Sequence, residues 1–173
     1  EGLSVFDISQ PASPDLIATL DLETPGCNSI TIEGDQALLA CNPSGFHVID
    51  ISDPLKPVHA GQAAEKGAML SIANRENFAF VVDSTQQGLA IMDHSNPASP
   101  KQVGLFTPSQ IPSDHNSSYM FESVRNCGEY LCIADGQNGL VVLDISRPEE
   151  PVALGVYGNI VPSGLIADGN VVY

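Results

Sequence analysis

The sequence has no tryptophan, and only six lysine and arginine residues stand against 21 aspartate and glutamate residues, which gives a formal net charge of −15. Such a surface repels phosphate backbones, so nucleic acid is not an expected partner. No apolar run approaches the roughly 20 residues that cross a bilayer, and we expect no membrane insertion by this segment. The acidity fits solubility in an extracellular or salty setting, or the recruitment of cations or a basic partner.

Sequence signatures of catalysis are missing as well. The chain has no G-x-S-x-G nucleophile elbow, no C-x-x-C pair and no glycine loop that would cradle a phosphate. It also lacks the D-x-D-x-D-G series of a calcium-binding loop. We therefore assign no catalytic residue, and no cofactor is evident from the sequence.

What the sequence does contain is one segment that occurs four times. Each copy reads Gly-x-x-x-x-Asp-x-Ser-x-Pro-x-x-Pro, with apolar residues between the glycine and the aspartate. The copies begin at Gly2, Gly45, Gly88 and Gly139, so the intervals are 43, 43 and 51 residues. A register kept over four copies indicates a repeat architecture.

A predicted β-hairpin lies between consecutive copies. These hairpins cover 29–32 with 37–40, 70–73 with 78–82, 121–124 with 130–134, and 164–167 with 171–173. The glycine-initiated strand and a strand after the prolines bring each unit to four strands, which is the period of a β-propeller blade. The glycine-initiated strand is apolar on both faces, as a sheet packed between two others requires. The sequence therefore predicts an all-β fold, a β-propeller of four-stranded antiparallel blades.

The repeated segment resembles the LVIVD repeat family of bacterial and archaeal surface proteins, and the four copies with their hairpins cover essentially the whole chain. One copy departs from the pattern, because His94 stands where isoleucine is usual. The resemblance implies a β-propeller in an exported protein, extracellular, at the cell surface or periplasmic. It implies no defined activity.

The repeat register divides the chain into units. Residues 1–26 hold the last two strands of one blade, complete blades cover about 27–66, 67–108 and 109–158, and 159–173 hold the first two strands of a further blade. The last hairpin lacks its usual ending, which favours a segment of a larger propeller of six to eight blades. The alternative is a closed four-bladed ring, in which the terminal strands would pair within one blade.

The longer third interval places an insertion at 108–119, in the connection between two blades. Insertions of this kind build ligand surface on one face of a propeller. The candidate binding residues for a metal or a partner are Asp114, His115, Asn116 and Tyr119. The alternative is a solvated loop without a ligand.

Other polar side chains have a functional and a structural interpretation. Asp83 and Asp135 follow the second strand of two blades, where carbonyl-rich turns would suit calcium, or where the carboxylates cap the turns. The repeated aspartates occupy one position in four blades and are interpreted as structural: Asp7, Asp50, Asp93 and Asp144. The histidines within strands or at their ends are interpreted as satisfied or surface side chains: His47, His59 and His94.

The four cysteines lie in two predicted hairpins. Cys27 and Cys41 come almost opposite each other across an antiparallel pair, where neighbouring side chains lie about 4.5–5.5 Å apart, and are the disulfide candidate in an oxidising compartment. Cys132 aligns with Leu38 and is expected to be a buried small apolar residue. Cys127 lies at the hairpin turn, several residues from Cys132 along the strand, so this pair is expected not to bridge.

Taken together, these observations predict a non-enzymatic exported propeller that acts as a binding or assembly scaffold through loops on one face, with a protein or glycan partner. One alternative is a propeller enzyme, a hydrolase or metal-dependent esterase, whose site is completed outside this segment. Another is an architectural subunit of an extracellular assembly.

Overall fold

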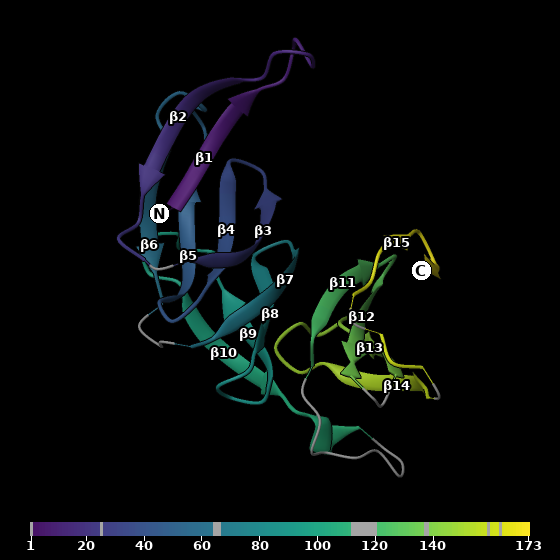
Figure 1. Cartoon of the computed structure of the whole chain (residues 1–173). Coiled ribbons are helices and arrows are strands. Elements are labelled where there is room, and N and C mark those ends of the chain that lie inside the picture. The colour runs from purple at the N-terminus through teal and green to yellow at the C-terminus, as the bar shows by residue number, and fades with distance from the viewer. Residues whose placement is uncertain are drawn as a thin grey trace.

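A computed structural model describes residues 2–24, 26–63, 67–111, 121–136, 139–158, 160–162 and 164–173. Three four-stranded antiparallel sheets and two two-stranded sheets follow one another along the chain (Figure 1). The first complete blade holds β3 (Cys27–Glu33), β4 (Gln36–Cys41), β5 (Gly45–Asp50) and β6 (Val58–Gln62). The second holds β7 (Met69–Arg75), β8 (Phe78–Asp83), β9 (Gly88–Asp93) and β10 (Lys101–Phe106). The third holds β11 (Ser123–Cys127), β12 (Tyr130–Asp135), β13 (Gly139–Asp144) and β14 (Val152–Tyr157).

The terminal sheets are half-blades. Strands β1 (Gly2–Asp7) and β2 (Asp15–Asp21) form one, and β15 (Ala167–Asp168) and β16 (Val171–Val172) form the other. The two pairs form separate sheets, and in Figure 1 the N- and C-terminal ends lie at opposite sides of the molecule. The all-β propeller prediction is confirmed, and the described strands do not form the closed four-bladed ring.

The repeated sequence determines how each third strand begins and ends. Gly139 has a positive φ of 97°, and a Cβ there would collide with the carbonyl oxygen of Tyr157, so a side chain is excluded. At the other end, an aspartate oxygen accepts the backbone N–H two residues later and closes the turn into the fourth strand. These bonds are 2.8 Å for Asp7–Ser9, 2.9 Å for Asp50–Ser52, 2.9 Å for Asp93–Ser95 and 2.7 Å for Asp144–Ser146. The structural interpretation of the repeated aspartates is confirmed.

The apolar core lies between the sheets. One cluster joins the second and third blades, with Phe80, Ile91, Leu131 and Val141 fully buried. A second cluster joins the first and second blades through alternate residues of the same strands, such as Val81 and Ala90. The sheet of the second blade is therefore apolar on both faces, as the sequence predicts. Among the described residues, the only helical element apart from isolated turns is the short 3-10 helix η1 (Pro108–Gln110). No helix in this part of the chain is long and apolar enough to span a membrane.

Two disulfides connect first to second strands. Cys27 and Cys41 are register partners with Cα atoms 3.8 Å apart, so the predicted bridge is confirmed. The expectation for the other pair is wrong, because Cys127 and Cys132 are also bridged, with Cα atoms 6.0 Å apart. Cys132 pairs with Arg125, two residues before Cys127, so both sulfurs lie on one face as a diagonal pair. Cys132 is buried, as expected.

Candidate functional site

A cleft lies where the turns of the second and third blades meet. The β7–β8 turn contributes Arg75 and Glu76, the β11–β12 turn contributes Glu129 and Tyr130, and the β13–β14 turn begins at Asp144. The lining is completed by Ile145, Ser146 and Pro148. Its volume of about 450 Å³ falls in the range of small-ligand and peptide side-chain sites.

The first strands of the two blades hold the walls of this cleft together. The amide Nδ2 of Asn126 donates to the carbonyl oxygen of Asn74 at 2.8 Å. The backbone N–H of Val124 donates to Ser71 Oγ at 3.2 Å. These contacts run directly from β7 to β11, so the turns at the ends of these strands keep a fixed separation.

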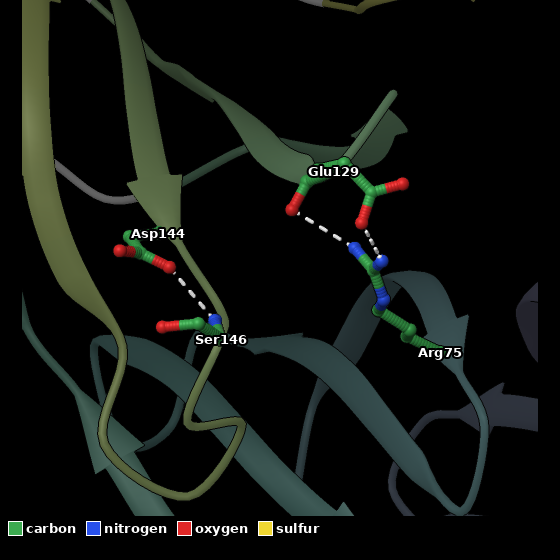
Figure 2. Close-up of polar contacts among 4 residues, drawn as sticks. All are labelled: Arg75, Glu129, Asp144 and Ser146. Atoms are coloured by element: carbon green, nitrogen blue, oxygen red, sulfur yellow. Dashed lines mark hydrogen bonds and ion pairs between the residues drawn. The ribbon is translucent and has the colours of Figure 1, made fainter.

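Arg75 joins the two walls. Its Nη1 donates to the carbonyl oxygen of Glu129 at 2.9 Å, and its Nη2 pairs with the carboxylate of the same residue (Figure 2). The guanidinium is therefore already engaged by Glu129, and the lining holds two further acidic groups, Glu76 and Asp144. The hydrogen bond from the Ser146 backbone lowers the pKa of Asp144 below its usual value of 3.8, so this carboxylate is ionised at neutral pH.

An adjoining cavity extends the cleft along the β13–β14 turn. It shares Ser146 and Pro148 with the first, has a volume of about 450 Å³, and is also lined by Phe78, Arg147, Glu149 and Glu150. Arg147 and Glu150 form an ion pair of 2.9 Å within the turn. We call both cavities together the turn-face cleft; acidic side chains outnumber basic ones in its lining, and Tyr130 is 42% exposed there.

The sequence-predicted binding residues Asp114, His115, Asn116 and Tyr119 lie outside the described residues. The described ends of the flanking strands, Phe106 of β10 and Ser123 of β11, lie at the opposite end of the strands from the turn-face cleft. A binding role for this loop stays a prediction.

The two weak calcium candidates lie at the ends of second strands in separate blades. Asp83 Oδ1 accepts the backbone N–H of Thr85 at 2.8 Å, and Oδ2 accepts the Gln86 amide at 2.8 Å, which is a turn-capping arrangement. Asp135 is fully buried at the equivalent position. No group of three or more histidine, cysteine or acidic residues gathers for a metal in the part of the chain that the structure describes. Calcium binding stays a prediction.

Two of the histidines on strands, His47 and His59, are in direct contact. His47 on β5 is 2% exposed, and its Nδ1 lies 3.2 Å from Nε2 of His59 on β6. The other ring nitrogen of His47 lies 3.0 Å from Ser44 Oγ, which in turn contacts the hydroxyl of Thr24 at 2.7 Å. Burial, together with the charge of His59, lowers the pKa of His47 from 6.5 to about 4. His94 is also buried, and its Nδ1 bonds to Gln36 at 3.0 Å.

The His47 pKa predicts a loss of stability in mild acid. Because the folded pKa of about 4 lies below the ordinary value of 6.5, the unfolded chain takes up a proton first as the pH falls. The free energy of unfolding is expected to fall from pH 6.5 towards pH 4, and His47 accounts for about 2 kcal/mol of this loss at about pH 5. Urea unfolding of the unmodified chain and of His47→Ala, both in EDTA, measures this contribution as the difference between their pH slopes.

Taking the difference between the two pH slopes cancels the contributions of the other titrating groups, because both proteins contain them. Burial lowers the pKa of His94 too, so His94 adds a loss of the same sign to both proteins. The repeated aspartates have pKa values below 3.8 and lose their turn-capping contribution only at lower pH. Equal slopes for the two proteins between pH 6.5 and 5 would contradict the prediction.

Sequence reasoning missed the turn-face cleft because it assigned the ligand surface to the connection with the insertion at 108–119. The signal that would have identified it is the repeat register, which places Arg75 and Glu129 in equivalent hairpin turns of adjacent blades. It also assigned Asp144 a turn-capping role alone, whereas this residue lines the cleft in addition.

Comparison with known proteins gives a family and a fold. A family model described as the LVIVD repeat matches residues 1–21, 27–64, 66–107 and 121–158. No curated protein sequence matches the chain.

Similar solved structures include the computationally designed Ika4 protein, with a TM-score of 0.66 and 9% identity over 90% of this chain and 88% of that one. A Lactobacillus plantarum protein has a TM-score of 0.70 and 15% identity over 90% of this chain and 50% of its own. A proposed 6-phosphogluconolactonase of Bacteroides uniformis has a TM-score of 0.70 and 9% identity over 95% of this chain and 52% of its own. The chain spans about half the length of the two bacterial proteins, and identities this low show the fold alone.

Proposed function

The chain belongs to the LVIVD repeat family, and from this premise we propose that it is part of a non-enzymatic, exported β-propeller scaffold that binds a basic segment of a protein partner in the turn-face cleft. The observation that carries the proposal is the cleft itself, a recess between two rigid blades with an acidic lining and an exposed tyrosine. Carboxylates attract Lys and Arg side chains, and the tyrosine ring offers a face for a cation.

The cleft also supports the choice of partner. Arg75 is engaged by Glu129, so the lining offers an incoming cation Glu76, Asp144 and the adjoining Glu149. The net charge of −15 extends the same attraction over the surface and speeds the encounter with a basic partner. We favour a basic protein segment over a glycan because charge is the dominant feature of the lining.

The two disulfides support export. Disulfides persist in oxidising compartments and are rare in the cytosol of mesophiles, so an extracellular, cell-surface or periplasmic location fits the bridges at Cys27–Cys41 and Cys127–Cys132. The proposed lactonase of Bacteroides uniformis shares the fold at 9% identity, which transfers no activity to this chain. No observation among the described residues favours the enzyme alternative.

A charge-matched pair of variants tests the partner class with hexalysine as the probe. We expect Glu76→Gln with Glu149→Gln to weaken hexalysine binding about fivefold at low salt, since each surface charge pair contributes up to about 1 kcal/mol. The control, Asp35→Asn with Asp168→Asn, removes the same charge from exposed positions of other blades. Isothermal titration calorimetry measures both. An equal loss in the control would show that hexalysine binds the overall charge and would contradict the proposed cleft.

A further inference from the structure

The His47–His59 pair lies on β5 and β6 of the first blade, away from the lining of the turn-face cleft, and the proposed scaffold role does not use it. We propose that these two histidines form a binding site for a transition metal ion such as Zn²⁺ or Cu²⁺, in which Nδ1 of His47 and Nε2 of His59 are the two protein ligands. Neither histidine lines the turn-face cleft.

The distance between the two nitrogens suits this role. Nδ1 of His47 and Nε2 of His59 are 3.2 Å apart. Two imidazole nitrogens that each bind one tetrahedral Zn²⁺ at about 2.0–2.1 Å lie about 3.3 Å from each other. A metal ion at these distances lies beside the line that joins the two nitrogens, so the rings turn to direct their lone pairs at it while the strands keep their separation.

The surroundings of His47 are those of a held metal ligand. In the tautomer that carries its hydrogen on Nε2, His47 donates to Ser44 Oγ at 3.0 Å, and its Nδ1 lone pair faces His59. Ser44 is itself fixed by Thr24, and Thr24 and His47 are 5% and 2% exposed. On metal binding, the hydrogen on Nε2 of His59 moves to its Nδ1, so both ligands stay neutral imidazoles and no proton is lost. His59 is exposed, so water or a further ligand reaches the remaining coordination positions.

The other blades show that the fold does not require histidine at these places. The register partner of His59 is Ile49, two residues after His47. The equivalent pairs of positions hold Ala90 with Gln102 and Val141 with Ala153 in the next two blades. A bulge between the third and fourth strands, at Val48/Ile49 in this blade, recurs in each of them. Both histidines thus occur together in a single blade, on a backbone that the next two blades form with alanine, valine or glutamine at these positions.

The repeat itself supplies the variants for the test. His59→Gln and His47→Ala each install the residue of the second blade, so the backbone is expected to tolerate them. The probes are Zn²⁺ by isothermal titration calorimetry and Cu²⁺ by electron paramagnetic resonance, both with excess Mg²⁺ to occupy surface carboxylates. We expect one Zn²⁺ per chain, a Cu²⁺ spectrum with nitrogen coupling, and about 100-fold weaker binding in either variant. Lys56→Ala, an exposed change in the same blade, is the control that keeps the affinity of the unmodified chain.

Three outcomes would overturn the site: no stoichiometric Zn²⁺ binding by the unmodified chain, unchanged affinity in His59→Gln, or a Cu²⁺ spectrum without nitrogen coupling. His59 is exposed, so His59→Gln stays informative if the buried His47→Ala variant fails to fold. The hexalysine experiment is read separately, because neither histidine lines the turn-face cleft.

Discussion

Replacing Phe80 with alanine is expected to lower the free energy of unfolding by about 3–5 kcal/mol. The side chain is fully buried on β8 and belongs to the cluster that joins the second and third blades. Its removal leaves a cavity between two sheets that close packing on both sides prevents from collapsing. Urea unfolding followed by circular dichroism measures the loss.

The chain offers a matched control for this change. Phe6 on β1 is 55% exposed, and Phe6→Ala is expected to cost less than about 1 kcal/mol. Val81, the neighbour of Phe80 in sequence, is also fully buried but lies in the other cluster, between the first and second blades. Val81→Ala is therefore expected to destabilise as well, although by less, because fewer atoms are removed. If Phe80→Ala cost no more than Phe6→Ala, the packing of blade against blade would not be the main source of stability.

The features that the sequence predicted are local or repeated. Strand identity, strand order and the turn-capping aspartates all follow from signals within one unit, such as Asp50 two residues before Ser52. The bridge between Cys27 and Cys41 was predictable because a count from the two-residue turn places them within one position of each other, and a bulge between Cys27 and Ser29 makes them register partners. Because the segment occurs four times, each local prediction is supported by four copies of the same pattern.

The features that the sequence did not predict depend on geometry between strands or between blades. The Cys127–Cys132 bridge joins a diagonal pair, which a count of directly opposite residues overlooks. The turn-face cleft depends on contacts between blades, among them the one in which Arg75 of one blade reaches Glu129 of the next, more than one repeat away in sequence. The His47–His59 contact depends on the bulge between β5 and β6, and bulges leave no reliable mark in a single sequence.

Removing the Cys27–Cys41 bridge by Cys27→Ala with Cys41→Ala is expected to cost about 3 kcal/mol of unfolding free energy, because the bridge closes a loop with a sequence separation of 14 and so restricts the unfolded chain. The same change at Cys127 and Cys132, whose separation is 5, is expected to cost about 2 kcal/mol, since a shorter loop loses less entropy.

The order of these two losses is the test, measured by urea unfolding without reductant. Both pairs link a first strand to the second strand of the same hairpin, and three of the four cysteines are buried, so the loss of packing is similar and loop length is the main difference. Adding a reductant to the unmodified chain is expected to reproduce the sum of both losses. If removal of the bridge with the shorter loop cost more, or if a reductant left the stability of the unmodified chain unchanged, the bridges would not act by restricting the unfolded state. Either result would weaken the argument that this propeller is stable in an oxidising compartment.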